Sequence, residues 1–138
     1  MFDSSTRRVL LVRNEGANFW YAPGGGWEAN QEDIRACAER ELFEETGIAG
    51  KIDRLIYTQQ FHASKTVIFL EWFWLAHPVS TTVIPNDHKD DHGIVCETRW
   101  FSREELQEKK VFPMRLKDTF WDHVDTWPNE EDPFLGVS

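Results

Sequence analysis

The chain has 138 residues and a formal net charge of −9, with seven tryptophans and a hydrophobic content of 41%. This length is typical of one domain that buries a sizeable core, and the apolar content excludes disorder of the main body. The acidic charge argues against general nucleic-acid binding, because phosphate backbones are bound by Lys and Arg. It leaves room for a phosphate-bearing small molecule whose charge a divalent cation balances.

Hydropathy and cysteine content favour a cytoplasmic protein. The longest apolar run, from Val67 to Ala76, is interrupted by Glu71, and no basic leader precedes an apolar stretch, so neither membrane insertion nor secretion is expected. Cys37 and Cys96 are too few for a disulfide framework or a zinc site. We expect both to be free thiols.

The apolar pattern predicts five strands, over residues 8–13, 19–22, 51–61, 66–76 and 93–101. Residues 66–76 are apolar on both faces apart from Glu71, which is typical of a central strand in a covered sheet. The strands alternate with predicted helices. We therefore expect a single α/β (α+β) domain.

The first helix is predicted from Gln31 to Thr46, a stretch without Pro or Gly. Gly47 follows where a helix needs a left-handed terminating residue. Asn30 or Gln31 is expected to begin the helix, which places acidic side chains in its first turn, where the helix dipole favours anions.

The C-terminal third is predicted to be helical. Ser102-Arg103-Glu104-Glu105 is a capping box that predicts a helix to about Lys110, and a second helix is expected from Met114 to Thr126. The domain is expected to cover residues 1–127. Residues 128–138 are predicted to be an acidic, flexible tail.

Three glutamates of the first helix are candidate metal ligands. Glu41, Glu44 and Glu45 stand at i, i+3 and i+4, so their carboxylates converge near the helix C-terminus. Like charges at this spacing are unfavourable, and anions are unfavourable at a helix C-terminus. A divalent cation would neutralise them, and oxygen-only ligands favour Mg²⁺ or Mn²⁺ over zinc. Arg40 could hold one carboxylate in a fixed orientation. Without further context, a solvated acidic face would be the better explanation of the three glutamates.

The segment before the helix supplies candidate substrate-binding residues. Glycines 24–26 form a loop in which the backbone can approach a ligand or metal closely. Trp20 and Tyr21 precede this loop and are candidates for stacking on a base. Arg13, Lys65 or Arg99 could bind phosphate, and the spacing does not separate these three.

Residues 26–48 fit the pattern G-x5-E-x7-R-E-U-x-E-E-x-G-U, where U is a bulky aliphatic residue. All nine constrained positions are satisfied, namely Gly26, Glu32, Arg40, Glu41, Leu42, Glu44, Glu45, Gly47 and Ile48. In this segment the chain resembles the Nudix hydrolases, a family that includes MutT-like members. Nine positions at fixed spacing make a chance match improbable. The resemblance implies a mixed β-sheet sandwiched between helices, over about residues 8–124.

The resemblance also implies the roles of individual residues. Glu41, Glu44 and Glu45, together with the carbonyl group of Gly25, would hold Mg²⁺ or Mn²⁺. Glu97 lies in a segment that resembles the family's E-x-x-W sequence, and it would be a further ligand or the general base. Glu41, Glu44 and Glu97 are the candidates for the base, and we favour Glu44; Glu97 could equally pair with an arginine.

The implied activity is hydrolysis of a diphosphate linkage in a nucleoside diphosphate linked to another group. Residues 64–66 lack the proline and tyrosine that mark family members acting on ADP-ribose or dinucleoside polyphosphates. By elimination, a MutT-type nucleoside triphosphate pyrophosphohydrolase is the leading hypothesis. Alternatives are ADP-ribose, a sugar nucleotide or another diphosphate, diphosphate isomerisation, and a ligand-binding sensor without turnover. All glutamates of the pattern at residues 26–48, which we call the Nudix box, are present. Their presence favours an enzyme over a sensor.

Two features leave structural alternatives open. Family members usually have a longer first strand, whereas only seven residues precede Arg8 here. Either that strand is missing or residues 2–6 pair differently. If the strand is missing, the unprotected sheet edge would allow a self-pairing homodimer as well as a monomer. The polar segment from Asp87 to His92 is predicted to be a turn, with transition-metal binding as the alternative.

Overall fold

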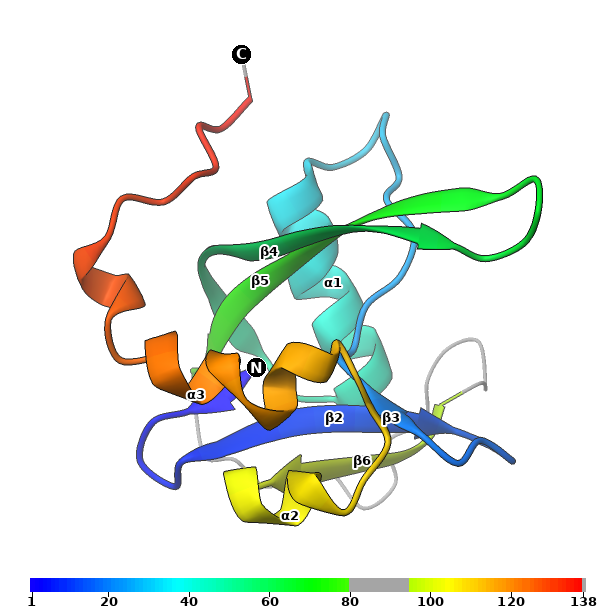
Figure 1. The fold of residues 1–138 in the computed structure, drawn as a ribbon. Coiled ribbons are helices and arrows are strands. Elements are labelled where there is room, and N and C mark those ends of the chain that lie inside the picture. Colours follow the sequence, from blue (N-terminus) through cyan, green and yellow to red (C-terminus); the bar gives the residue numbers. More distant parts are fainter. Residues whose placement is uncertain (80–94, 138) are drawn as a thin grey trace.

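The computed structural model describes residues 1–79 and 95–137 (Figure 1). The strands are β1 (Phe2–Asp3), β2 (Arg8–Asn14), β3 (Trp20–Tyr21), β4 (Gly50–His62), β5 (Ile68–Pro78), β6 (Val95–Phe101) and β7 (Val111–Phe112). The helices are α1 (Ile34–Thr46), α2 (Arg103–Gln107) and α3 (Thr119–His123), with 3₁₀ helices η1 (Met114–Lys117) and η2 (Trp127–Asn129). No helix within these residues is long and apolar enough to span a bilayer.

Strand β2 is the centre of a five-stranded mixed sheet. It pairs antiparallel with β6, from Val9 opposite Phe101 to Asn14 opposite Val95. Along its other edge, β1 pairs with its first half and β3 with its second half, both antiparallel. β7 then pairs with β3 in parallel. The predicted mixed sheet is therefore confirmed, with β7 as a strand that the sequence pattern did not indicate.

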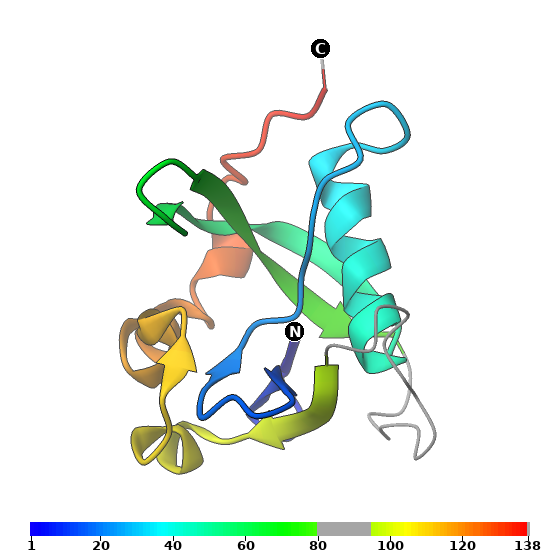
Figure 2. The same ribbon diagram turned by 90° about the vertical axis from the view of Figure 1, so that its right-hand side faces the viewer.

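Two hydrophobic cores lie on opposite faces of β2. Successive side chains of a strand point to opposite faces, and Val9 and Leu11 belong to one core while Leu10 belongs to the other. The first core includes Leu106, Leu116, Phe120 and Trp121 of the C-terminal helices. The second includes Leu42 of α1. Helices therefore cover the strands from two sides (Figure 2), as the sequence predicted.

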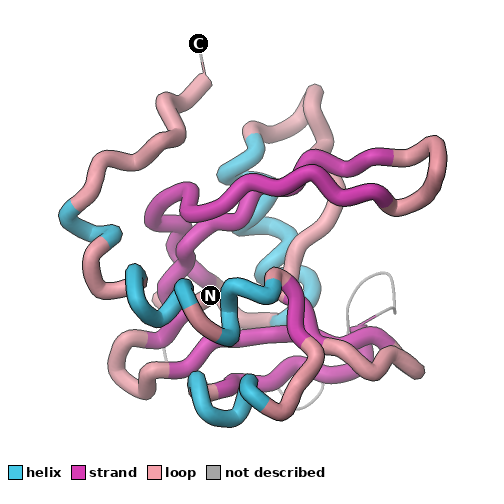
Figure 3. Tube along the Cα trace, viewed as in Figure 1, coloured by secondary structure: helices cyan, strands magenta, loops and turns pink. Residues whose placement is uncertain are grey.

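Strands β4 and β5 form a long hairpin that extends beyond the rest of the domain (Figure 3). Its inner half is packed, and Ile52, Leu75 and Ala76 are buried. Its outer half is exposed, including all four apolar residues from Val67 to Leu70. The prediction that residues 66–76 form a central covered strand is therefore wrong, because among the described strands β5 pairs with β4 alone. β2 is the strand that is covered on both faces.

The N-terminal residues pair with β2 in a short hairpin. Phe2 lies opposite Val9, and Asp3 lies opposite Arg8. Arg7 has a left-handed backbone with φ of 56°, which closes the turn between the two strands. Of the two alternatives for this segment, the structure thus supports different pairing of residues 2–6 over a missing strand.

Several helix ends differ from the sequence predictions. α1 begins three residues later than expected, because Asp33 is its N-cap and its carboxylate accepts from the backbone N–H groups of Arg35 and Ala36. Gly47 ends α1 with φ of 69°, as predicted. The capping box is confirmed, but α2 ends at Gln107.

The second C-terminal helix is also shorter than predicted, because non-helical backbone at Asp118 separates η1 from α3. The Asp118 carboxylate accepts from the backbone N–H of Thr119, the first residue of α3, and so caps this helix.

The C-terminal segment packs against β4. The buried guanidinium of Arg54 donates to the backbone carbonyl groups of Trp127, Glu130 and Glu131. Asp132 forms an ion pair with Arg35 of α1 at 2.7 Å. The boundary at residue 127 and a flexible tail stay predictions, but these contacts hold residues 127–132 on the domain in this structure.

Candidate active site

The guanidinium of Arg40 binds three carboxylates of the predicted box. Nε and Nη2 contact the two oxygens of Glu32 at 3.0 and 2.6 Å. Nη1 is shared between Glu41, at 2.8 Å, and Glu44, at 3.0 Å. Nη2 also donates to the carbonyl oxygen of Gly26 at 3.2 Å. Arg40 thereby ties the C-terminal half of α1 to the preceding loop.

These contacts shift the ionisation of the network. The hydrogen bonds from Arg40 lower the pKa of Glu32 to about 2. The same contact with Glu32, followed by those with Glu41, raises the pKa of Arg40. Glu32 and Arg40 are therefore both charged at neutral pH.

Glu41 lies directly against the glycine loop. Its side chain is buried, with 7% of the residue exposed. A Cβ atom added to Gly25 would lie 2.5 Å from Glu41 Oε1 and closer still to its other carboxylate atoms. The absence of a side chain at Gly25 is thus what allows the carboxylate to reach the loop backbone.

Glu45 contacts the same loop from the next turn of α1. Its carboxylate accepts from the backbone N–H of Gly24 at 2.9 Å. Glu41 and Glu45 therefore both face the loop of residues 24–26. This is the arrangement in which a loop carbonyl and helix carboxylates can share one ligand.

The charges of this cluster are not balanced within it. Among the described residues, the carboxylates of Glu32, Glu41 and Glu44 are all ion-paired with the one guanidinium of Arg40, so this group carries more negative than positive formal charge. Within residues 1–79 and 95–137, no three acidic, His or Cys side chains already converge as a metal-binding group. In this structure Nη1 of Arg40 binds both Glu41 and Glu44. The donors are hard oxygens, which fit Mg²⁺ or Mn²⁺, and the residual charge favours a cation.

A cavity of about 580 Å³ opens beside Glu41. Its walls come from the glycine loop, α1 and β5, and they are mostly apolar. Its volume lies within the range of small-molecule sites. The buried carboxylate of Glu41 is therefore next to a space that can hold the organic part of a ligand.

Residues 1–119 match the family model of the NUDIX domain. The chain belongs to the Nudix family. The resemblance predicted from residues 26–48 is thus confirmed over most of the chain.

Three relatives show the range of proteins that this Nudix domain is similar to. Nucleoside diphosphate-linked moiety X motif 6 of Mus musculus is 34% identical over 112 residues, which are 80% of this chain and 35% of that protein. RNA pyrophosphohydrolase of Haemophilus ducreyi is 30% identical over 120 residues, which are 87% of this chain and 53% of that protein. Diphosphoinositol polyphosphate phosphohydrolase 2 of Homo sapiens is 33% identical over 100 residues, which are 70% of this chain and 51% of that protein. The aligned region thus spans about a third to a half of these relatives.

Solved structures confirm the Nudix fold. A NUDIX hydrolase from Nitrosomonas europaea superposes with a TM-score of 0.74 at 21% identity, covering 99% of this chain and 93% of that one. A MutT NUDIX hydrolase from Burkholderia pseudomallei gives a TM-score of 0.60 at 22% identity, covering 80% and 85%. At these identities the likeness concerns the fold.

The structure does not bring every predicted site residue to the Nudix box. Gly25, Arg40, Glu41, Glu44 and Glu45 are gathered there. Of the described residues, the cavity lining includes Gly25 and Glu41 but not Arg40, Glu44 or Glu45, and it does not include the other candidates, which are Arg13, Trp20, Tyr21, Lys65 and Glu97.

Arg13 and Glu97 pair with each other across β2 and β6, at 2.6 Å. In this structure the two side chains are paired with each other. It stays a prediction that Glu97 is a metal ligand or the base, and that Arg13 binds phosphate. Lys65 lies in the exposed turn between β4 and β5. Arg99 is paired with Glu105 at 3.7 Å.

Trp20 is buried in this structure, and its role in stacking on a base stays a prediction. Only 7% of the residue is exposed, and its ring packs edge-on against Phe101 with centroids 4.8 Å apart. The guanidinium of Arg13 covers the ring as well, 5.6 Å from its centroid. The Tyr21 hydroxyl donates to the side-chain oxygen of Asn14. Stacking of Tyr21 on a base stays a prediction. The segment from Asp87 to His92 lies outside the described residues.

Sequence reasoning missed the aromatic residues of the cavity. Trp72 and Phe73 belong to residues 66–76, which were predicted to be a covered central strand, but both line the cavity, and Trp72 is 40% exposed. Trp27 also lines it and is 50% exposed. A large apolar side chain within a glycine-rich loop was the available signal for Trp27.

Proposed function

We propose that this Nudix domain is a Mg²⁺-dependent pyrophosphohydrolase, with Mn²⁺ as an alternative cation. Its leading substrate is a nucleoside triphosphate, which it would hydrolyse to a nucleoside monophosphate and pyrophosphate. The observation that carries the proposal is the position of Glu41, a buried carboxylate that lies against Gly25 beside an apolar cavity.

Glu41, Glu44 and Glu45, with the carbonyl group of Gly25, are the groups that would hold the cation. When bound, the cation supplies charge neutralisation at the phosphate oxygens and lowers the pKa of the attacking water. Glu41 and Glu44 share one Nη1 of Arg40, so either carboxylate can leave it while Glu32 keeps Arg40 in place through two hydrogen bonds.

Glu44 is the group that we assign as general base. It is less buried than Glu41, with 24% of its side chain exposed against 10%, so water can reach it more readily. A carboxylate in contact with the attacking water can accept its proton during attack on phosphorus. Arg40 fixes the orientation of this carboxylate through a hydrogen bond of 3.0 Å.

The direct test is product analysis with millimolar Mg²⁺ across a panel of canonical and oxidised nucleoside triphosphates, ADP-ribose, sugar nucleotides and dinucleoside polyphosphates. We expect pyrophosphate release from triphosphates and its loss in Glu44→Gln. Glu39→Gln is the matched control, because Glu39 is an exposed acid on the same helix at an unconstrained position of the pattern. Equal loss in both variants, or turnover that persists in Glu44→Gln, would contradict the assignment of Glu44.

The same panel separates the alternatives. Cleavage of ADP-ribose or a sugar nucleotide without triphosphate cleavage would assign the domain to another diphosphate substrate. Rearrangement of the organic group with its diphosphate intact would indicate an isomerase. Saturable binding without any product would indicate a sensor.

A further inference from the structure

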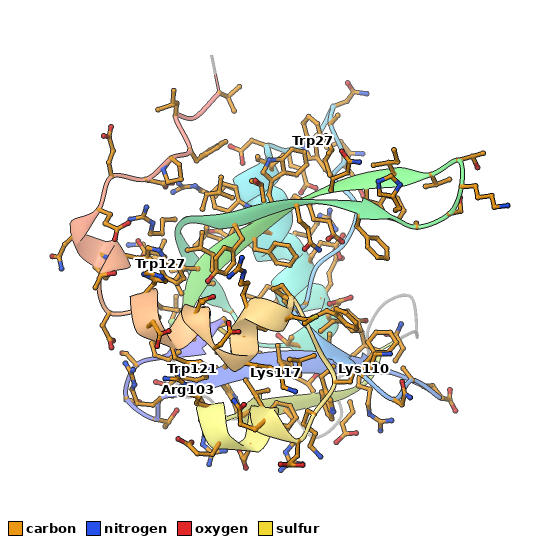
Figure 4. The ribbon with its side chains drawn as sticks, in the orientation of Figure 1. Trp27, Arg103, Lys110, Lys117, Trp121 and Trp127 are labelled. Carbon is orange, nitrogen blue, oxygen red and sulfur yellow. The ribbon has the colours of Figure 1, made fainter. Side chains whose placement is uncertain are left out.

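The outer half of the β4–β5 hairpin exposes apolar side chains on both of its faces. Every residue from 58 to 70 is exposed, and Figure 4 shows the side chains of this part projecting beyond the loop that carries Trp27. Five of these side chains are large and apolar, and each is between 42% and 62% exposed. We call them the hairpin patch, which consists of Phe61, Val67, Ile68, Phe69 and Leu70.

The hairpin patch covers both faces because neighbouring residues of a strand point in opposite directions. Phe61 and Phe69 lie opposite each other and stack on one face, with ring centroids 6.5 Å apart. Ile68 and Leu70 therefore point to the other face. Contiguous apolar surface of this kind on a soluble protein marks an interaction site.

The outer half of the hairpin also has unprotected strand edges. Among the described strands, β4 and β5 pair only with each other, so each presents a row of backbone groups without a partner strand. Proteins protect such edges with proline, charged side chains or bulges. Residues 58–70 contain no proline, and Lys65 is their single Lys, Arg, Asp or Glu. Both register shifts of the hairpin lie between Ile52 and Tyr57, in its inner half.

The sequence of β5 has the pattern of a covered strand. Residues 66–76 are apolar on both faces apart from Glu71, which is typical of a strand that is buried on both sides. In the described part of the domain, only the inner half of β5 is buried in this way. A second molecule at the outer half would supply the cover that the sequence pattern predicts.

Electrostatics favours a second copy of the same chain in this position. The chain has a net charge of −9, so two copies repel each other over most of their surface. Residues 58–70 have a formal charge of +1, from Lys65, and Glu71 follows them directly. In an antiparallel pair of β5 strands with a two-fold axis at Ile68, residues three positions before and after Ile68 lie opposite each other. Lys65 of one copy is then opposite Glu71 of the other, and this contact occurs twice.

The exposed area is sufficient for a specific dimer. Taking roughly 200 Å² for a large apolar side chain, the five half-exposed members of the hairpin patch offer about 500 Å² per copy. Two copies together bury about 1,000 Å² of apolar surface, which is the lower bound for a biological interface. Exposed polar neighbours such as Gln60 and Thr66 add to this area. An interface of this size is consistent with a dissociation constant in the micromolar range.

We propose that two copies of this chain associate through the outer half of the hairpin, with the β5 strands antiparallel and Ile68 at the two-fold axis. Backbone groups of the two β5 edges pair with each other, and the ion pairs between Lys65 and Glu71 fix the register. The proposal concerns assembly and is independent of the proposed function, because association is measured without substrate. Failure of either one leaves the other in place.

The first test is sedimentation velocity of the full chain from about 1 µM to about 300 µM, which brackets a micromolar dissociation constant. The wild type should change from monomer to dimer over this range. Ile68→Lys places two like charges at the axis and should raise the dissociation constant at least about tenfold. Met114→Lys is the matched control, because Met114 is 69% exposed on η1, outside the hairpin, and should dimerise like the wild type. Urea unfolding of each variant checks that it remains folded.

A charge exchange tests the register of the two strands. Lys65→Glu and Glu71→Lys each bring like charges together at two positions of the dimer. Each should raise the dissociation constant about 5-fold to 50-fold. The double variant restores opposite charges, so its dissociation constant should return to within about threefold of the wild type.

A disulfide tests the position of the axis. Directly opposite residues of antiparallel strands have Cα atoms about 4.5–5.5 Å apart, a separation that a disulfide can bridge. In a Cys37→Ala, Cys96→Ala background, Ile68→Cys should therefore give a covalent dimer on oxidation with copper phenanthroline. Met114→Cys in the same background should remain monomeric in denaturing gels.

Four results would overturn the proposal. The wild type could remain a monomer over the whole concentration range, or it could grow into assemblies larger than a dimer. Ile68→Lys could dimerise as strongly as Met114→Lys. The double charge variant could associate as weakly as the single variants. Ile68→Cys could form no more covalent dimer than Met114→Cys.

Discussion

Replacing Gly25 with alanine separates the position of Glu41 from the stability of the domain. The added Cβ would lie 2.5 Å from Glu41 Oε1, whereas ordinary contact begins at 3.4 Å. Because the obstructing atoms are the end of a flexible side chain, the carboxylate must shift by about 1 Å while the backbone can stay in place. Gly25 does not have a left-handed backbone, so alanine introduces no conformational strain.

The expected effects of Gly25→Ala on stability and on activity differ in magnitude. Moving Glu41 into a less favourable rotamer costs about 0.5–1.5 kcal/mol of unfolding free energy. Misplacing a ligand of the reacting groups by about 1 Å can lower kcat/KM by about 100-fold. We therefore expect Gly25→Ala to fold, to lose no more than about 1.5 kcal/mol in urea unfolding, and to be nearly inactive in pyrophosphate release.

The controls are the neighbouring glycines. A Cβ on Gly24 or Gly26 would meet no atom within 4 Å, so Gly24→Ala and Gly26→Ala should retain activity. If Gly25→Ala were as active as these controls, catalysis would not require Glu41 to lie against the loop. If all three variants were equally inactive, loop flexibility would explain the loss better than the position of Glu41.

Three further predictions concern stability and reactivity. Arg54→Met should lower the unfolding free energy by about 2–4 kcal/mol, because it leaves three carbonyl groups without their donor. The control Arg7→Met removes an ion pair whose side chains are 48% and 65% exposed, and it should cost less than about 1 kcal/mol. Equal costs would contradict a stabilising role of the contacts between Arg54 and the C-terminal segment. Burial and the nearby carboxylates raise the pKa of Cys37 to about 11, so in a Cys96→Ser background iodoacetamide labelling should rise about tenfold per pH unit from pH 8 to 10; a plateau near pH 8 would refute this. Although burial opposes it, hydrogen bonds from backbone N–H groups and a nearby guanidinium lower the pKa of Asp132, so its charge stabilises the fold above the usual carboxyl pKa and this stabilisation is lost as pH falls below it. The stability difference between wild type and Asp132→Asn, measured by urea unfolding from pH 6 to 2, should shrink toward low pH, and a constant difference would refute the linkage.

Local signals in the sequence determined the chemistry of this protein. The spacing of the box glutamates follows from helix geometry, and Gly47 and the Ser102–Glu105 capping box act within one turn of their helices. These features depend on neighbours within four residues, so they can be read without knowing the fold. The start of α1 was misplaced because several capping residues follow one another there, and only the turn formed by residues 28–32 selects Asp33.

Tertiary structure decided which surfaces those elements meet. The apolar runs of β2 and β5 look alike in sequence, yet β2 has a helix layer on each face and the outer half of β5 has none. Trp20 and Trp72 are both strand tryptophans, but Phe101 and Arg13 cover the first and the cavity exposes the second.

Pairing between distant segments likewise had no local signal. Arg13 meets Glu97 because β2 and β6 are adjacent across 84 residues of chain, and Glu41 reaches Gly25 because the loop folds back along α1. Hydrophobic periodicity states which face of an element avoids water. It cannot state what covers that face, because burial is a property of the assembled layers. The sequence therefore indicated the candidate carboxylates, and the fold determined the shape of the cavity beside them.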